Sequence, residues 1–150
     1  MIENPTIHAS AVLIGAKAVL IRGPAGAGKS QLAFDLLQAA SQSALPFARL
    51  VADDRAYVEA RAGRLLVRPA EALVGLLEIR GLGIRRLPHE AMAVVGLVVD
   101  LAAADATRHP AREAANVSIA GISLPRLAAA ADMPALPLIL AFVRTRAAGD

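Results

Sequence analysis

The sequence predicts an α/β fold with a mixed central sheet, and two observations carry this prediction. Short apolar runs typical of strands alternate with a run in which apolar residues recur at helical spacing. A glycine-rich loop stands between one of those strands and that helix. Hairpin-like connections early in the chain predict a sheet less regular than a doubly wound one. At 150 residues, the chain is expected to form one domain.

The first half of the chain predicts a hairpin, an amphipathic helix, a strand and a second hairpin. In each hairpin, two short apolar runs flank a connection that contains glycine. In the helix, apolar residues recur three and four positions apart. In chain order, these elements are predicted at residues 11–14 and 18–21, 30–40, 49–52, and 57–60 with 65–67.

The second half is less regular. A helix is predicted from Pro69 through Leu77, followed by a loop that Gly81 and Gly83 impose. The further predictions are a buried strand at 94–101, a weaker strand at 119–122, a short helix at 125–131, and a run at 136–143 that fits either strand or helix.

Composition argues against several functional classes. The net charge of +3 and the pI of about 10.2 suggest a nucleic-acid partner, but the arginines are scattered and aromatics make up only 3% of residues, so none is predicted. The longest apolar runs fall short of the roughly 18 residues that span a bilayer, and no signal-peptide pattern opens the chain. We therefore expect a soluble protein without a membrane partner. The absence of cysteine excludes disulfides and fits a cytoplasmic location.

A phosphate-binding loop is the strongest motif in the sequence. Residues 23–30 satisfy the pattern G-x-x-x-x-G-K-S between an apolar strand and an amphipathic helix. Glycines let backbone N–H groups surround phosphates, the lysine reaches the β- and γ-phosphates, and the serine hydroxyl ligates Mg²⁺. The predicted ligands are therefore ATP, or a close relative, and Mg²⁺. The predicted binding residues are Gly23, Pro24, Ala25, Gly26, Ala27, Gly28, Lys29 and Ser30.

Carboxylates elsewhere in the chain are candidates for the metal or the nucleophile. Asp53 and Asp54 follow an apolar strand, and because neighbouring side chains on a strand point to opposite faces, only one is predicted to face the phosphates. Glu78 and Arg80 suit metal and phosphate contacts, although a surface ion pair explains them equally well. From the residues alone, His8 is more consistent with a surface or packed histidine than with a catalytic one.

Four landmarks in order resemble the catalytic domain of the HPr kinase/phosphorylase family, which modifies a serine of the phosphocarrier protein HPr. They are His8, the loop at 23–30, the segment L-V-A-D-D-R at 50–55, and the segment L-E-I-R-G-L-G-I at 77–84. The last segment looks like that family's own signature. The resemblance covers residues 8 to about 87. It implies a P-loop kinase domain similar to the nucleotide-binding fold of phosphoenolpyruvate carboxykinase, usually assembled as a hexamer.

The resemblance also implies roles for individual residues. Lys29 would bind phosphate, Ser30 and Glu78 would ligate Mg²⁺, and Asp54 would take the proton of the HPr serine. His8 would lie beside the phosphates in the active site. Asp53 is a further candidate at the metal, and Arg108 is a candidate for the family's catalytic arginine. The chain would then be an ATP-dependent serine kinase acting on HPr.

Three departures from the family pattern limit this reading. The N-terminal domain of longer members has no counterpart, as in short forms resembling those of α-proteobacteria, so a single catalytic domain is expected. The connection at 41–49 looks longer than the family norm. The proline-arginine-glycine segment linked to dephosphorylation has no match in residues 136–146, which puts the phosphorylase activity in doubt. Another P-loop kinase or NTPase, and a regulatory nucleotide-binding module without catalysis, remain the alternatives.

Overall fold

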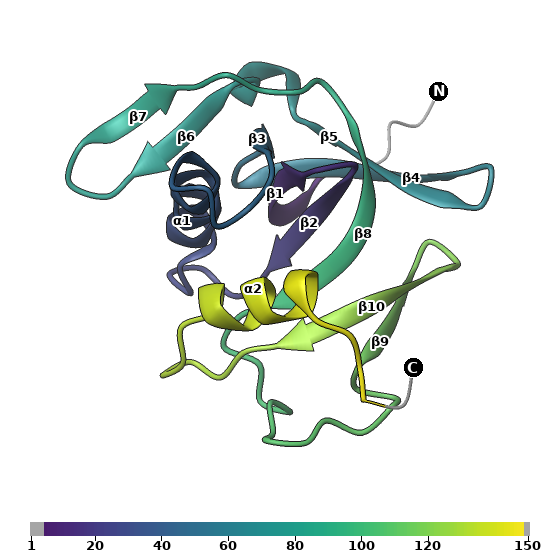
Figure 1. Cartoon of the computed structure of the whole chain (residues 1–150). Coiled ribbons are helices and arrows are strands. Elements are labelled where there is room, and N and C mark those ends of the chain that lie inside the picture. The colour runs from purple at the N-terminus through teal and green to yellow at the C-terminus, as the bar shows by residue number, and fades with distance from the viewer. Residues whose placement is uncertain (1–4, 149–150) are drawn as a thin grey trace.

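The computed structural model describes residues 5–148, which form an eight-stranded mixed sheet with helices packed against it (Figure 1). The main sheet contains β1 (Ile7–Ile14), β2 (Lys17–Arg22), β3 (Ala48–Ala52), β4 (Arg55–Arg61), β5 (Arg64–Pro69), β8 (Ala93–Asp100), β9 (Asn116–Ile119) and β10 (Ile122–Ala128). The other elements are α1 (Lys29–Ser41), a 3₁₀ turn (Glu71–Leu73), β6 (Leu76–Ile79), β7 (Gly83–Arg86) and α2 (Leu136–Arg144).

Five strands of the sheet close into a ring. The order β2-β1-β4-β5-β8 returns on itself because β8 also pairs with β2, in parallel. Strand β1 pairs antiparallel with β2, β3 and β4, and β10 pairs parallel with β8 and antiparallel with β9. The α/β fold with a mixed sheet is therefore confirmed. Its three parallel strands β2, β8 and β10 end at one edge, where the glycine-rich loop begins.

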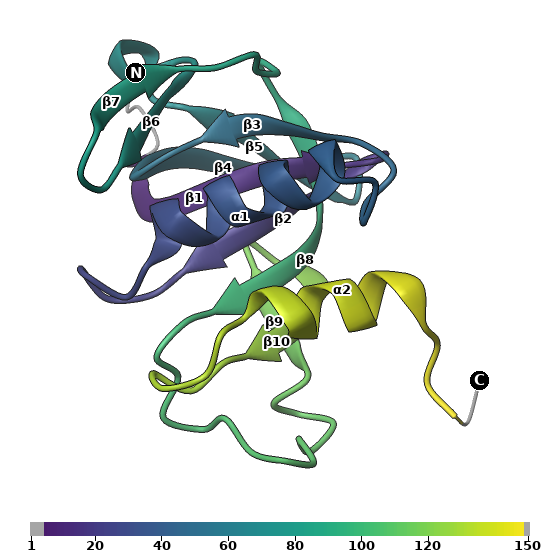
Figure 2. The same ribbon diagram turned by 60° about the vertical axis from the view of Figure 1, so that its left-hand side comes forward.

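The two faces of the central strands build two cores. Side chains alternate across a strand, so Val19 and Ile21 of β2 pack toward α1, while Ala18 and Leu20 pack inside the ring. The ring interior is narrow, and small residues fill much of it. Its buried alanines are Ala9, Ala11, Ala18, Ala52, Ala56 and Ala93. Figure 2 shows α1 lying along the sheet face, and Figure 1 shows the β6–β7 hairpin next to that helix, which β6 contacts.

The elements predicted in the first 68 residues are present. Both hairpins form, and the second turns at Ala62 and Gly63, whose φ angles of 52° and 78° suit a tight two-residue turn. The buried strand predicted at 94–101 is β8, and the ambiguous run at 136–143 is the helix α2. No helix in residues 5–148 combines the length and apolar character needed to cross a membrane.

Two predicted helices are wrong. Between Pro69 and Leu77 the chain forms only a 3₁₀ turn, because Gly75 at a φ of 73° interrupts it and Leu76 and Leu77 enter β6. The glycine loop predicted after Glu78 is present as the turn of the β6–β7 hairpin, with positive φ at Gly81 and Gly83.

The helix predicted at 125–131 is instead part of strand β10. Pro125 sits where pairing passes from β9 to β8, a position that tolerates its missing N–H. The weaker strand predicted at 119–122 spans the β9–β10 turn, with positive φ at Ala120 and Gly121.

Candidate active site

The glycine-rich loop connects β2 to α1, whose first N–H groups have no partner within the helix and can bind an anion. Gly28 caps α1 with a φ of 97°, a conformation that favours glycine, and no side chain caps the helix. The first turn of α1 carries no acidic residue, so no carboxylate of the helix itself offsets the positive end of its dipole. At the other end of the loop, a Cβ on Gly23 would lie only 3.1 Å from the Leu101 Cβ, so the loop passes close to the end of β8.

Lys29 holds its positive charge inside the loop. Its Nζ donates hydrogen bonds to the backbone oxygens of Gly23 at 2.8 Å and Pro24 at 3.1 Å, and only 9% of the residue is exposed. These partners are neutral carbonyls. The ammonium charge therefore remains available to an anion bound in the loop.

Asp53 accepts hydrogen bonds from three other elements of the site. Its Oδ1 accepts hydrogen bonds from the hydroxyls of Ser10 and Ser30, each at 2.7 Å, and its Oδ2 accepts one from the Glu78 backbone N–H at 3.1 Å. Only 4% of Asp53 and none of Ser10 is exposed. This carboxylate joins β1, α1 and β6 to the end of β3. It also orients the Ser30 hydroxyl, whose lone pairs stay free for a cation.

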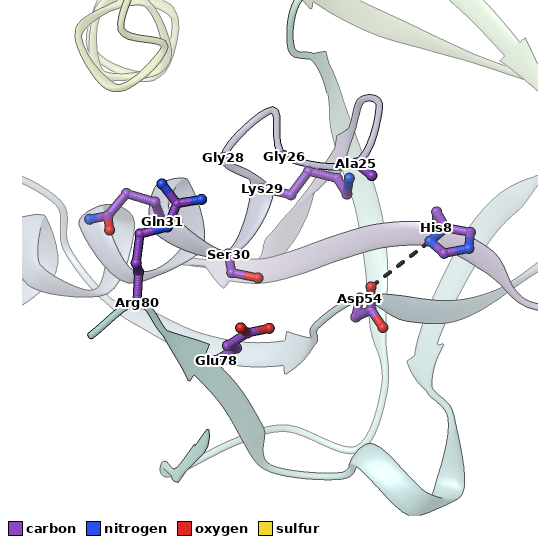
Figure 3. Close-up of a pocket in the computed structure, with 10 residues that line it drawn as sticks. All are labelled: His8, Ala25, Gly26, Gly28, Lys29, Ser30, Gln31, Asp54, Glu78 and Arg80. Carbon is purple, nitrogen blue, oxygen red and sulfur yellow. Dashed lines mark ion pairs between the residues drawn. The ribbon is translucent and has the colours of Figure 1, made fainter. Parts of the chain in front are cut away.

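A cavity of about 480 Å³ opens beside the loop. Figure 3 shows Ser30 of α1, Glu78 of β6, His8 of β1 and Asp54 of the β3–β4 connection pointing into the same space. His8 Nδ1 lies 3.9 Å from Asp54 Oδ1, and both side chains are more than half exposed. The residues that line the cavity are His8, Ala25, Gly26, Gly28, Lys29, Ser30, Gln31, Asp54, Glu78 and Arg80.

Asp54 adopts an unusual backbone conformation. Its φ is 68°, in the left-handed region that aspartate tolerates better than most residues. This conformation breaks the strand between β3 and β4 and turns the Asp54 carboxylate toward the cavity, away from its buried neighbour Asp53. Of the two aspartates, only Asp54 lines the cavity, and Asp53 contacts the site through Ser30.

An ion network lies beneath the start of the loop. Arg22 donates to both oxygens of Asp100 at 2.8 and 2.9 Å, and Arg126 donates to Asp100 at 2.6 Å and to both oxygens of Asp105 at 2.9 and 3.0 Å. Burial by itself would raise the pKa of Asp100, but hydrogen bonds and charge from the two arginines outweigh it and lower that pKa. The hydrogen bond from Arg126 lowers the pKa of Asp105. The network joins the ends of β2, β8 and β10.

The structure brings together most of the residues that the sequence predicted, but not Arg108. That residue lies in the β8–β9 loop and is not among the residues that line the cavity. In Figures 1 and 2 this loop lies at the opposite end of the molecule from the β6–β7 hairpin.

Several residues of the site were missed. Ser10 carried a usable signal, because it is the one polar residue in the apolar run 9–14. Arg22 and Asp100 each close an apolar strand, whereas Arg126 was hidden by the wrong helix prediction.

Comparison with known proteins identifies the family. Residues 1–125 match the model of the HPr serine kinase C-terminal domain. The chain belongs to this family. The HPr kinase/phosphorylase of Streptococcus thermophilus is 45% identical over 83 residues, which cover 55% of this chain and 25% of that protein. The protein of the same name from Clostridium beijerinckii is 36% identical over 78 residues, 52% of this chain and 24% of the relative. This HPr serine kinase C-terminal domain therefore matches only about a quarter of those relatives' length.

The fold is also similar to a solved member structure. The HPr(Ser) kinase/phosphatase of Coxiella burnetii matches with a TM-score of 0.71 at 24% identity, over 93% of each chain. At that identity the likeness establishes the fold, which agrees with the predicted P-loop kinase class.

Proposed function

We propose that this chain is a single catalytic domain that transfers the γ-phosphoryl group of ATP to a serine of HPr. The observation that carries the proposal is the convergence of Lys29, Ser30, Asp54 and Glu78 on one cavity. Phosphoryl transfer depends mainly on positioning and on neutralising charge, and these residues supply both. Membership in the HPr serine kinase C-terminal domain family supports HPr as the substrate.

The residues of the cavity fit Mg²⁺ held together with phosphates. Ser30 and Glu78 offer a hydroxyl and a carboxylate to the same space, and Asp53 supports Ser30 from behind. Within residues 5–148, no three His, Asp or Glu side chains form a metal cluster. The pair of Ser30 and Glu78 suits Mg²⁺, which commonly binds through one or two carboxylates, substrate phosphates and water. When bound there, Mg²⁺ would neutralise charge on the transferring phosphoryl group.

Asp54 is the proposed general base. It accepts the proton of the HPr serine hydroxyl while the serine oxygen bonds to the γ-phosphorus and the bond to the ADP oxygen breaks. Its 64% side-chain exposure leaves it open to a protein substrate. His8, 3.9 Å away, is proposed to help position that carboxylate. Lys29 binds the β- and γ-phosphates, and backbone N–H groups of the loop, among them those of Gly26 and Gly28, surround them.

The β6–β7 hairpin is a suitable contact surface beside the cavity. Leu82 and Ile84 are 59% and 67% exposed, and the same hairpin carries Glu78 and Arg80 of the cavity. Exposed apolar side chains next to a site are typical of protein contacts. We therefore include HPr docking at this hairpin in the proposal, together with homo-oligomeric assembly, hexameric as the family resemblance implies, and a cytoplasmic location.

The test is to incubate the purified protein with HPr, ATP and Mg²⁺ and to measure by mass spectrometry whether HPr gains a phosphoryl group on serine. We expect this gain with the wild type and with Lys17→Ala, which removes the only other lysine of the sequence, an exposed one. Lys29→Ala should abolish it while the circular dichroism spectrum is unchanged. If HPr gains no phosphoryl group with the wild type, the proposal that HPr is the substrate is refuted. Hydrolysis of ATP, or transfer to a metabolite alone, would favour the alternative P-loop enzymes.

A further inference from the structure

Ser10 lies on β1 at the point where that strand changes partners. On one edge, β1 pairs with β3 along its second half and with β4 along its first two residues. Ser10 falls between these two stretches, opposite the break that Asp53 and Asp54 form between β3 and β4. The Ala9 N–H donates to the Asp54 backbone oxygen at 3.2 Å and closes the gap. The side chain at position 10 therefore lies within reach of both aspartates.

The hydroxyl of Ser10 is fully buried. Its neighbours Ala9 and Ala11 pack inside the ring, so the alternation of side chains turns Ser10 toward the α1 side of the sheet. Burying a hydroxyl is unfavourable unless it is hydrogen-bonded, and the Ser10 Oγ donates to Asp53 Oδ1 at 2.7 Å. Apolar packing does not require this hydroxyl, and its partner is the carboxylate that orients Ser30.

The same hydroxyl contacts the two aspartates in different ways. Ser10 and Ser30 donate to one oxygen, Asp53 Oδ1, each at 2.7 Å. Ser10 thus holds that oxygen in place while the Ser30 hydroxyl turns its lone pairs to the cavity. The Ser10 Oγ also accepts from the Asp54 N–H in a long contact of 3.5 Å. Asp54 is the residue whose φ of 68° turns its carboxylate into the cavity.

We propose that Ser10 is a positioning residue of the phosphoryl-transfer site. It acts through Asp53 on the Ser30 hydroxyl, and through the Asp54 backbone on the proposed base. Ser10 does not line the cavity, so it acts without touching the ligand. This inference rests on the proposed binding of Mg²⁺ and nucleotide in that cavity. Loss of a partner that orients a metal ligand commonly weakens the metal by about 10–100-fold, and Ser10 is one bond further away, so we expect about tenfold.

The first test measures metal binding and does not depend on HPr. Mg²⁺ is titrated calorimetrically in the presence of a non-hydrolysable ATP analogue. Ser10→Ala should weaken Mg²⁺ about tenfold, and Ser10→Cys, which nearly keeps the volume but is a weak donor, should do the same. Ser10→Thr keeps a hydroxyl and should restore most of the affinity. A result in which Ser10→Ala binds Mg²⁺ as tightly as the wild type would overturn the inference.

Val12→Ala is the matched control for lost packing. Val12 is fully buried two residues along the same strand, packs into the core with α1 and does not line the cavity. Val12→Ala should lower the Tm at least as much as Ser10→Ala and leave Mg²⁺ affinity unchanged. If Val12→Ala weakens Mg²⁺ as much as Ser10→Ala does, the effect reports stability alone and the inference fails.

A double variant tests the route through Asp53. In the Asp53→Asn background, Ser10→Ala should change Mg²⁺ affinity by less than about twofold, because residues that act through one contact are not additive. A full further tenfold loss would contradict this route.

The contact to Asp54 is tested by phosphoryl transfer to HPr at saturating Mg²⁺. The kcat of Ser10→Ala should remain about tenfold below that of the wild type, because the base is less well positioned. A kcat fully restored by Mg²⁺ would contradict the effect on Asp54. If Ser10→Ala weakens Mg²⁺ as expected but the wild type leaves HPr unmodified, the kinase proposal fails and the role of Ser10 at the metal stands.

Discussion

Replacing Arg126 by alanine should destabilise the domain markedly. Arg126 is 13% exposed and donates to Asp100 at 2.6 Å and to the Ala114 backbone oxygen at 2.9 Å. A hydrogen bond to a charged group contributes about 1.5–3 kcal/mol, and one to a neutral carbonyl about 1 kcal/mol. The bonds to Asp105 add little, because that carboxylate is exposed. The expected loss is about 2.5–4 kcal/mol, or about 5–16 °C in Tm for a domain of this size.

The assay is urea and thermal denaturation of the apo protein, followed by circular dichroism. Arg64→Ala is the control: an exposed arginine whose loss should cost less than about 0.5 kcal/mol. The lowered pKa of Asp100 also sets a pH dependence. The stability it contributes is present above its ordinary pKa of 3.8 and is lost as pH falls through the lower folded value. The difference between wild type and Arg126→Ala should therefore shrink below about pH 4. A loss under about 1 kcal/mol at pH 7 would refute this reasoning.

Three further predictions follow from the site and the core. Asp54→Asn should slow phosphoryl transfer to HPr by about 10²–10⁴-fold and leave ATP affinity nearly unchanged. The Tm should also stay nearly unchanged, since asparagine tolerates the φ of 68°. Equal losses of rate and affinity would contradict the role of Asp54 as the base. Asp53→Asn should weaken Mg²⁺ binding in the presence of ATP by about 10–100-fold, measured by metal titration, whereas unchanged Mg²⁺ affinity would show that its bond to Ser30 is irrelevant to the metal. Leu36→Ala, at a fully buried position of α1, should cost about 2–5 kcal/mol in urea denaturation, and a loss below about 1 kcal/mol would mean that α1 is not packed as described.

Local sequence signals were sufficient to predict an element whose conformation depends on its own residues. The loop at 23–30 and the helix after it follow from glycine spacing and helical periodicity, and both are present. The turn at Ala62 and Gly63 was readable for the same reason. The same local signals gave wrong predictions where the structure depends on pairing with another strand. Leu76 and Leu77 fit a helix by spacing, but β7 pairs with them and Leu77 packs into the core with α1.

The candidate site was predictable residue by residue but not as an arrangement. The sequence indicated that Asp53 and Asp54 lie near the phosphates, yet it could not show that Asp54 turns outward through a positive φ. It also could not show that Asp53 accepts bonds from Ser10, Ser30 and the Glu78 backbone, because those partners come from three other elements. The network of Arg22, Asp100 and Arg126 was invisible for a related reason: its members meet only because β8 pairs in parallel with both β2 and β10.

The central claim is that the loop holds a nucleotide with its terminal phosphate turned toward Asp54 and Glu78. A crystal structure with Mg²⁺ and a non-hydrolysable ATP analogue tests it most directly. The account predicts phosphates surrounded by the backbone of residues 23–28 and contacted by Lys29, with the metal on Ser30 and Glu78. An analogue bound elsewhere, or a terminal phosphate on the far flank of the loop from Asp54, would contradict it.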